Sequence, residues 1–473
     1  MPKSELRIDI LGTSLSISTD EEPEYLDLLL DKYHSAVENV QRKTGLKDPL
    51  KTAILTGFLL CDELEKAGKV TVKNDEPIEA EQLTLGMISR LDEIVSTKNS
   101  NGIIKLQGSI KNYDWGSAEW LPVLLGQKNL SRVPWAELWL ELNPSEPNYE
   151  KLPFLFKVLA AEKPLSIQVH PNLNEARDGF ERENMKRIPI DAPNRNYKDP
   201  NEKKEIICAL SPFVALCGFR EQWEISSLME ILSILPAKNE EALKTCLDKL
   251  ILALEGENPL KTFLNDFYCL DNEAIKTLTS SIKSQINLLK NDFPEYKNTW
   301  ELCVYLSNLY PEDPLIFAPL FLNIIELEPG EAIYVPAGTI HSYVKGMGIE
   351  LMTYSDNVLR GGLTVKHVDT EDILNNTDFS VHKPEIMPAP AAESLLHRYP
   401  APIEDFSLSV INNRREPFSY PKTGPSIMLI TEGTATVAES DIVLSKGESV
   451  FIPRGINLEF SGTFAAFVAA APV

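Results

Sequence analysis

Short apolar runs bounded by Gly, Pro or Asn fill most of the chain from residue 103 onward. Runs of four to eight apolar residues are typical of strands and too short for most helices. This part of the chain is therefore predicted to be mainly β, with strands in the runs at 154–161, 166–169, 206–210, 324–327 and 332–335.

One segment of this region occurs twice. The sequence GEAIYVPAG at 330–338 returns as GESVFIPRG at 447–455. Each copy predicts a turn, a short strand and a second turn, so we expect two related barrels. His341 follows the first copy by three residues, whereas Leu458 stands at the equivalent position of the second. Since an apolar residue is compatible with the turn, His341 must serve another purpose.

Two regions have a different periodicity. Between 221 and 310, leucines recur at helical spacing, as at Leu243, Leu247 and Leu250, and predict a helical insertion. Near the N-terminus, apolar and polar residues alternate on both sides of Gly12 and predict a hairpin. Three helical stretches follow, at about 26–40, 50–64 and 83–94.

These patterns divide the chain into domains. We expect a small hairpin and helical domain at 1–97 and a linker at 98–102. A first barrel follows at 103–220 and 311–383, interrupted by the helical insertion at 221–310. A second barrel without metal ligands occupies 384–473.

Composition narrows the classes of partner. A formal charge of −23 argues against nucleic acid and anionic membranes, which both require a basic surface. No apolar run is long enough to span a membrane, and the first residues do not resemble a signal peptide. The six cysteines are scattered without a CxxC pair, which is typical of reduced thiols in a cytoplasmic protein.

Four residues distant in sequence offer ligands of the kind that hold a transition metal. Gln168 and His170 are two residues apart in an extended run, so we expect both side chains on one face of a strand. Glu205 begins the run at 206–210, and His341 adds a second imidazole. Two nitrogens and two oxygens suit zinc, although iron or manganese would also accept them. Each histidine alone is more often packed or solvated than bound to metal, so spacing leaves the question open.

A second group of polar residues surrounds a glycine pair. Arg360 and Lys366 are cations six residues apart, and Gly361 and Gly362 allow a ligand close to the backbone. An arginine can hold a phosphate through two parallel hydrogen bonds. By itself this pattern favours an ordinary surface loop with solvated charges, with a phosphate site as the alternative.

Together these segments resemble the type I phosphomannose isomerase family, in the family's order and from about residue 103 to the C-terminus. The matching segments are 112–116, 137–139, 166–171, 196–201 with Glu205, 215–220, 336–343 and 355–366. The resemblance implies cupin, or jelly-roll, barrels. It also implies one Zn²⁺ per chain held by Gln168, His170, Glu205 and His341. The implied pocket is lined by Ser166, Lys203, Tyr343, Glu350, Asp356, Arg360 and Lys366.

The implied reaction interconverts mannose 6-phosphate and fructose 6-phosphate by moving a proton between C2 and C1 through a cis-enediol. The C2 proton is weakly acidic, so the step needs a positioned base and a group that stabilises the developing oxyanion. Zinc can polarise the carbonyl as a Lewis acid. We expect Arg360 to bind the phosphate with help from Ser166 or Lys366. The base stays open among Lys203, Glu350 and Asp356.

Two positions depart from the family pattern. Many relatives read NHKPE where this chain reads NEKKE at 201–205. Glu202 therefore replaces a histidine that is a candidate for opening the sugar ring, and it brings a carboxylate beside a metal ligand. Asn143 replaces a second frequent histidine. We expect activity to survive, with an altered pH profile.

Residues 1–97 resemble ZapA, a bacterial cell-division protein associated with the Z ring. The likeness lies in the opening at 7–12, the Leu-rich helix from Glu24 and the helical stretch at 51–64. Those proteins form dimers and tetramers through a long final coiled coil, but here the third helical stretch ends near Ser96. We expect this segment to dimerise the enzyme, or alternatively to pack on its own barrel as an appendage.

Two other classes of function compete with an isomerase. A cupin oxygenase would use a similar set of histidines and carboxylate with iron, but it has no need of Arg360 and Lys366. A non-catalytic sugar-phosphate sensor or a division-linked scaffold would have no need of the intact ligand set. The isomerase is therefore favoured.

Overall fold

The computed structural model describes most of the chain after residue 101: 102–143, 151–235, 240–391, 393–414, 417–421, 423–438, 440 and 442–472. Before that it describes 4–10, 13–19, 29, 30, 32–38, 40, 52, 56, 57 and 60. The chain divides into two compact units, Met1–Leu91 and Asp92–Val473. Among the described residues, none of the helices combines the length and the apolar character that crossing a membrane requires.

The first unit contains the predicted hairpin. Strand β1 (Ser4–Ile10) pairs antiparallel with β2 (Thr13–Thr19), from Ser4 opposite Thr19 to Ile10 opposite Thr13. The described positions between 29 and 40 and between 52 and 60 are helical, as the first two stretches predict. The third stretch, at 83–94, and the linker up to residue 101 lie outside the described residues.

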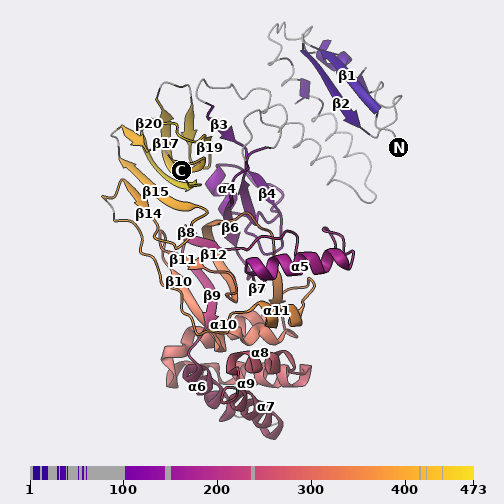
Figure 1. Cartoon of the computed structure of the whole chain (residues 1–473), viewed down its shortest axis with the longest axis vertical. Coiled ribbons are helices and arrows are strands. Elements are labelled where there is room, and N and C mark those ends of the chain that lie inside the picture. Colours follow the sequence, from indigo (N-terminus) through magenta and orange to yellow (C-terminus); the bar gives the residue numbers. More distant parts are fainter. Residues whose placement is uncertain are drawn as a thin grey trace. The chain divides into compact units, whose positions relative to one another are not determined.

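Ten of the described strands of the second unit form one sheet, which builds the first barrel (Figure 1). Its main path runs β4–β5–β6–β12–β9–β10, and the long strand β12 also pairs with β7 and β8, which pair in turn with β13 and β11. The strands are β4 (Ser109–Lys111), β5 (Glu137–Leu140), β6 (Phe154–Ala161), β7 (Ile167–Val169), β8 (Glu205–Ala209), β9 (Phe213–Phe219), β10 (Leu322–Leu327), β11 (Ala332–Val335), β12 (His341–Thr353) and β13 (Leu359–Gly362).

Nine described strands form the second sheet, whose main path runs β14–β15–β21–β17–β19–β3. Strand β3 precedes the first barrel in sequence but pairs with β19, so it belongs to the C-terminal sheet and not to the first barrel, where the predicted bound at residue 103 placed it. The strands are β3 (Ile104–Leu106), β14 (Leu396–Arg398), β15 (Ser407–Arg414), β16 (Phe418–Tyr420), β17 (Ser426–Val437), β18 (Val443–Ser445), β19 (Ser449–Ile452), β20 (Leu458–Ser461) and β21 (Thr463–Ala470).

Helices α6 to α10 follow β9 and gather at the end of the first sheet that faces away from the second sheet (Figure 1). Phe267 and Trp300 of this helical region share an apolar cluster with Val169 and Leu359 of β7 and β13. The helices and 3₁₀ turns of the second unit are α4 (Trp120–Leu125), α5 (Leu173–Met185), α6 (Gln222–Ser233), α7 (Glu240–Ala253), α8 (Pro259–Tyr268), α9 (Asn272–Asp292), η1 (Pro294–Tyr296), α10 (Lys297–Leu309), η2 (Pro314–Leu320) and α11 (Thr370–Asn376).

The repeated segment adopts the same conformation twice. Its glycines at 330, 338, 447 and 455 all have positive φ, between 72° and 91°, where a side chain is disfavoured. The glutamate after the first glycine accepts a hydrogen bond from the backbone N–H three residues earlier in both copies, Glu331 from Glu328 and Glu448 from Ser445. The prediction of a mainly β chain with two related barrels and a helical insertion is confirmed, while the exact domain bounds stay predictions.

Strand β6 shows how the core separates into layers, because all eight of its residues are buried. Successive side chains of a strand point to opposite faces. Phe156 and Val158 join Phe451 in the cluster between the two sheets, whereas Leu159 joins the cluster inside the first barrel. Lys157 lies on this inner face as well, so the interior of the first barrel is partly polar.

Candidate metal centre

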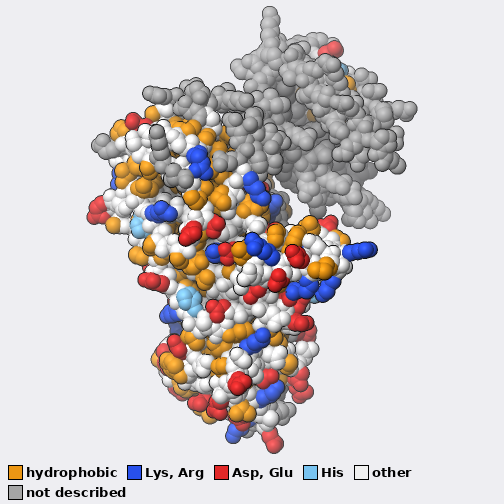
Figure 2. Space-filling model, viewed as in Figure 1, with side chains coloured by type: hydrophobic (Ala, Val, Ile, Leu, Met, Phe, Trp, Pro, Cys, Tyr) orange, Lys and Arg blue, Asp and Glu red, His pale blue; other side chains and the backbone are white. Residues whose placement is uncertain are grey.

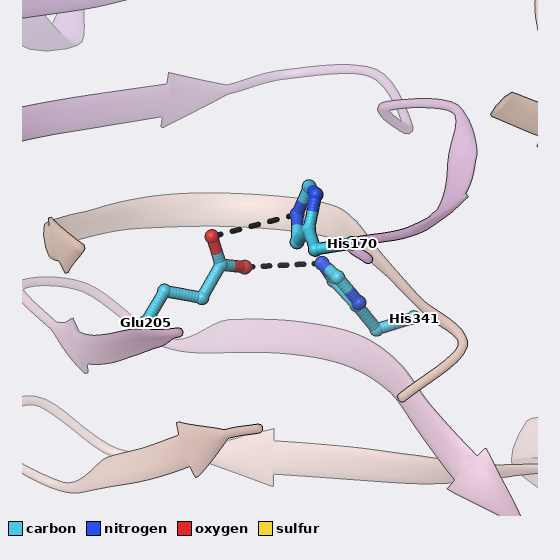
Figure 3. A group of neighbouring side chains, drawn as sticks. All are labelled: His170, Glu205 and His341. Atoms are coloured by element: carbon cyan, nitrogen blue, oxygen red, sulfur yellow. Dashed lines mark ion pairs between the residues drawn. The ribbon is translucent and has the colours of Figure 1, made fainter. Parts of the chain in front are cut away.

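Three buried side chains converge in the first barrel: His170 directly after β7, Glu205 at the start of β8 and His341 at the start of β12 (Figure 3). One ligand atom from each lies within 4.8 Å of the other two. Glu205 Oε1 is 3.0 Å from His341 Nε2, and Glu205 Oε2 is 3.6 Å from His170 Nε2. The side chains are at most 1% exposed. Residues 171 positions apart in the chain thus form one compact group.

Local structure fixes the position of His170. The backbone N–H of Gly338, in the turn of the first repeat copy, donates to the carbonyl of His170 at 2.8 Å. After Pro171 the chain enters α5 through a capping box, in which Asn172 and Glu175 accept each other's backbone N–H. The repeat turn and the helix start therefore hold His170 from both sides of the strand end.

Both imidazoles direct the same nitrogen toward Glu205. His170 Nδ1 lies 2.8 Å from the carbonyl oxygen of Asn357, and His341 Nδ1 lies 2.8 Å from that of Thr339. Because a carbonyl only accepts, each Nδ1 carries the hydrogen and each Nε2 presents a lone pair to the centre of the group. Burial and the nearby Lys203 ammonium hold the pKa of His170 well below its ordinary value, so this ring is neutral.

The centre of the group has the character of a cation site. His170 Nε2 is buried without a hydrogen-bond partner among the described residues, and the buried Glu205 Oε2 has ion-pair contacts, with Lys203 Nζ at 3.3 Å, but no well-formed hydrogen bond, a costly arrangement for a native interior. Burial would raise the pKa of Glu205, but Lys203 at 3.3 Å and the histidines outweigh it and hold that pKa well below its ordinary range. A carboxylate and two neutral imidazoles that meet through lone pairs fit a divalent metal ion.

Gln168 lies next to this group. On the β7–β12 ladder it stands opposite His341, and its Nε2 is 3.3 Å from His341 Nε2. Rotation of the amide would bring Oε1 to this position instead. Gln168 also stands opposite Arg360 on the β7–β13 ladder. Since opposite residues share a face of the sheet, the three side chains form a row that places Arg360 beside the predicted ligands.

A second cation, Lys366, lies six residues after Arg360 and contacts the aromatic ring of Tyr113. Burial lowers the pKa of the half-buried Arg360, and Asp356 partly compensates. Lys366 is exposed; desolvation and Arg360 lower its pKa, and its Nζ lies 5.2 Å from the centre of the Tyr113 ring. Two cations that repel each other in this way are suited to share an anion. Ser166 is half-buried and directly precedes β7.

The remaining predicted catalytic residues lie at different depths. Glu350 is buried beside Lys157, with 3.4 Å between Oε2 and Nζ, and burial raises its pKa. Asp356 is partly exposed and forms an ion pair of 2.6 Å with Lys198, which lowers its pKa against the effect of burial. Around α5, on the face drawn in Figure 2, Lys and Arg side chains lie among Asp and Glu side chains.

Tyr343 is buried and donates a hydrogen bond of 2.8 Å to Glu205 Oε1. Burial and the charge of Glu205 raise the pKa of its hydroxyl well above the ordinary value. Tyr343 therefore remains protonated and acts as a donor that orients the carboxylate.

Sequence reasoning missed two residues of this site. Lys157 was visible as the one charged residue in the apolar run at 154–161, and such a residue inside a buried strand signals a polar interior. Burial opposes its charge, but Glu350 and Glu137 outweigh that effect and raise the pKa of Lys157. Asn357 lies in a segment that matched the family, but its contact with His170 depends on tertiary structure.

The structure corrects the expectation for Glu202. Its carboxylate forms an ion pair of 2.5 Å with Lys204, which also interacts with Tyr334 and Asp405. Lys203 and Glu205 point into the barrel instead. The carboxylate of Glu202 is therefore turned away from the predicted metal ligands rather than placed beside them. Asn143 is exposed, beyond the end of β5.

Comparison with known proteins identifies the family. The family described as phosphomannose isomerase type I, catalytic domain, matches residues 144–222. Mannose-6-phosphate isomerase of Escherichia coli (strain K12) is 34% identical over 391 residues, which cover 74% of this chain and 94% of that protein. The chain belongs to the type I phosphomannose isomerase family. The mannose-6-phosphate isomerase of Schizosaccharomyces pombe is 30% identical and covers 76% of this chain and 96% of its own.

Solved structures of phosphomannose isomerases have the same fold. A zinc-bound mannose 6-phosphate isomerase is 32% identical, with a TM-score of 0.69 over 78% of this chain and 100% of that one. A substituted form of phosphomannose isomerase from Salmonella typhimurium is 31% identical, with a TM-score of 0.68 over 78% and 99%. The family of cell division protein ZapA matches residues 6–97. Both resemblances seen in the sequence are therefore confirmed, the second as a likeness of one segment.

Proposed function

We propose that this chain is a mannose-6-phosphate isomerase that holds one Zn²⁺ through Gln168, His170, Glu205 and His341. One observation carries the proposal. The lone pairs of two imidazoles and a buried carboxylate meet beside Arg360, and polar atoms of this group lack hydrogen-bond partners among the described residues. Family membership and the zinc-bound relative support the same reaction and the same metal.

The residues around the centre have separable tasks. A bound metal ion would act as a Lewis acid on a sugar oxygen. Arg360 binds the phosphate through its guanidinium, with help from Ser166 or Lys366, which lie beyond the end of the β7–β13 pair where Ile167 is opposite Gly362. Tyr343 orients Glu205.

Proton transfer between C2 and C1 requires a buried group that can both gain and lose a proton. Among Lys203, Glu350 and Asp356, we favour Glu350. It is buried and its pKa is raised, whereas Asp356 is partly exposed and already paired with Lys198. Lys203 is held against Glu205, so its task is to balance the charge of that carboxylate.

The other two classes of function receive less support. A cupin oxygenase would leave the row from His341 through Gln168 to Arg360 without a purpose. A sensor or scaffold would not explain why candidate metal ligands have buried atoms without a hydrogen-bond partner among the described residues.

The direct test is a coupled assay that detects fructose 6-phosphate formed from mannose 6-phosphate. We expect turnover by the purified protein, its loss after treatment with a chelator and its recovery on addition of Zn²⁺. Equal turnover by protein stripped of metal would contradict the proposal, as would uptake of oxygen by an iron-loaded form in place of isomerisation.

Removal of the Asn357 side chain is expected to weaken metal binding. Its amide accepts from the backbone of Lys198 and Asp199 and donates to the carbonyls of Asp199 and Asn201, while its own carbonyl holds His170. Asn357→Ala keeps the backbone carbonyl that holds His170 but loses the side-chain hydrogen bonds that place it, so we expect a loss of up to about tenfold, the lower end of the 10- to 100-fold range for outer partners of a metal ligand. Asn357→Ala should show this loss in a competition titration with a chromophoric chelator.

The matched control is Asn298→Ala, because Asn298 is an exposed asparagine whose side chain donates a hydrogen bond to Glu326, far from the metal centre in the described structure. A lower melting temperature with unchanged Zn²⁺ affinity in Asn357→Ala would reduce Asn357 to a purely structural residue.

Glu202→His is expected to leave the pH–rate profile unchanged. The side chain at this position faces Lys204 and not the metal ligands, so a histidine there would titrate away from the substrate. Stability should fall by about 1 kcal/mol or less, because the lost ion pair with Lys204 is still partly exposed to solvent. The measurement is kcat/KM between pH 5.5 and 9, a window set by the ordinary histidine pKa of about 6.5. A new limb near that pKa would show that residue 202 does reach the site.

We further propose that residues 1–97 dimerise the enzyme in the cytoplasm. The match of 6–97 to the ZapA family supports an oligomerisation role. The free thiols among the described cysteines, such as buried Cys208 and Cys303, suit a reducing compartment. Light scattering on the full chain and on a form without residues 1–100 would test the idea, and an unchanged oligomeric state would contradict it.

A further inference from the structure

Two residues outside the sheet contact β13, the strand that carries Arg360. A Cβ added at Gly361 would lie 2.6 Å from the hydroxyl of Tyr268, the last residue of α8. A Cβ added at Gly362 would lie 2.9 Å from Oδ1 of Asp313, directly before η2. Because both residues are glycines, α8 and the residue before η2 can approach the backbone of β13 closely.

The same two glycines form an irregularity in the ladder. Arg360 pairs with Gln168, but the next pair joins Gly362 to Ile167, so Gly361 is an extra residue in β13. A bulge of this kind changes the direction in which neighbouring side chains point. The position of Arg360 therefore depends on whatever maintains the bulge.

Leu363 follows the bulge in a strained conformation. Its φ of +54° lies in the left-handed region, which residues with a branched side chain rarely adopt. Such a conformation persists only where the surroundings enforce it. The side chain of Leu363 is buried in the cluster of the helical region, so both its backbone and its side chain are tied to that region.

Asp313 supplies the enforcing contact. Its Oδ2 accepts a hydrogen bond of 2.5 Å from the backbone N–H of Leu363, and its Oδ1 accepts one of 2.8 Å from that of Leu315. Hydrogen bonds to an ionised carboxylate are among the strong ones. One side chain thus joins the start of η2 to the residue that closes the bulge.

We propose that Asp313 is a positioning residue for phosphate recognition. By holding Leu363 in the left-handed conformation, it keeps the bulge at Gly361 and so aims Arg360 at the site. The inference rests on the proposed function, since it assigns Arg360 to the phosphate of the substrate. It gives the short segment between α10 and η2, which leads from the helical region back to the barrel, a task in substrate binding.

The test compares Asp313→Asn with Glu312→Gln. Asparagine has the shape of aspartate but one acceptor oxygen, so one of the two backbone N–H groups loses its partner. Glu312 is the adjacent, exposed acid, within 4.0 Å of Lys276, and provides a matched control. We expect Asp313→Asn to raise KM for mannose 6-phosphate about tenfold, the effect of one buried charge-assisted hydrogen bond, with kcat changed less than about twofold.

A second measurement does not depend on activity. Hydrogen exchange of the Leu363 amide should be faster in Asp313→Asn than in wild type and Glu312→Gln. Unchanged KM together with unchanged protection of Leu363 would overturn the inference. Faster exchange with unchanged KM would also overturn it, because Asp313 would then stabilise the strand without aiming Arg360.

If Asp313→Asn does not fold, a variant pair replaces it. Gly361→Ala should raise KM because its Cβ meets the Tyr268 hydroxyl, and the additional change Tyr268→Phe should restore part of the loss. A Gly361→Ala enzyme with wild-type KM would overturn the inference. Failure of the wild type and of Glu312→Gln to turn over the sugar would instead refute the proposed function, while the exchange of Leu363 would still decide whether Asp313 holds the strand.

Discussion

Replacement of His341 by leucine is expected to leave a folded protein that binds no metal and turns over mannose 6-phosphate about a thousandfold more slowly, since a catalytic metal is worth several kcal/mol. His341 supplies one of the two buried imidazole lone pairs that face Glu205. Leu458 already occupies the equivalent position of the second barrel at the start of β20, so the fold accepts leucine there. Metal content by mass spectrometry and kcat/KM by the coupled assay are the measurements.

His382→Leu is the matched control. His382 is exposed, and its carbonyl rather than its ring contacts Asn323. This variant should retain metal and activity. A His341→Leu protein that keeps a full equivalent of Zn²⁺ but loses activity would move His341 from metal binding to another step. A protein that no longer unfolds cooperatively would show that the centre is required for the fold.

Arg360→Lys is expected to lower kcat/KM for mannose 6-phosphate by about 10- to 100-fold, mostly through KM. Lysine keeps the charge but cannot make two parallel hydrogen bonds to a phosphate, and one hydrogen bond to a charged group is worth about 1.5–3 kcal/mol. The measurement is steady-state kinetics, with inorganic phosphate as a competing inhibitor whose affinity should fall in parallel.

Two comparisons make this prediction specific. Arg398→Lys changes an exposed arginine in β14 of the other sheet and should have no effect. Mannose without its phosphate should be turned over equally poorly by wild type and Arg360→Lys, because the lost contact is absent from both reactions. A loss of kcat with unchanged KM would assign Arg360 to the chemical step instead of phosphate binding.

Much of the site could be read from the sequence because strands impose a period of two. The run before His170 placed Gln168 and His170 together, and the repeat showed that His341 is not needed for its turn. The charge of Lys157 within an apolar strand was equally visible, but its partner Glu350 is 193 residues away, and no local pattern joins them.

The direction of Glu202 shows where such reading fails. The expectation rested on the nearness of Glu202 to Glu205 in sequence, but Glu202 pairs with Lys204 while Lys203 pairs with Glu205, so the two carboxylates lie on opposite faces of this segment. The assignment of β3 to the first barrel was wrong for a related reason. A strand of three residues carries little pattern of its own, so its sheet is decided by which edge the rest of the fold brings beside it.

The sequence by itself determined the β texture, the two related barrels and the identity of the metal-binding candidates, since these depend on local periodicity and on residue type. Only the tertiary structure decided which nitrogen of each histidine faces Glu205, that Lys157 and Asn357 belong to the site, and that Asp313, between α10 and η2, reaches Leu363. The reason is physical: side-chain direction along a strand is set by neighbouring residues, whereas the partner that a side chain meets is set by which distant strands and helices pack beside it.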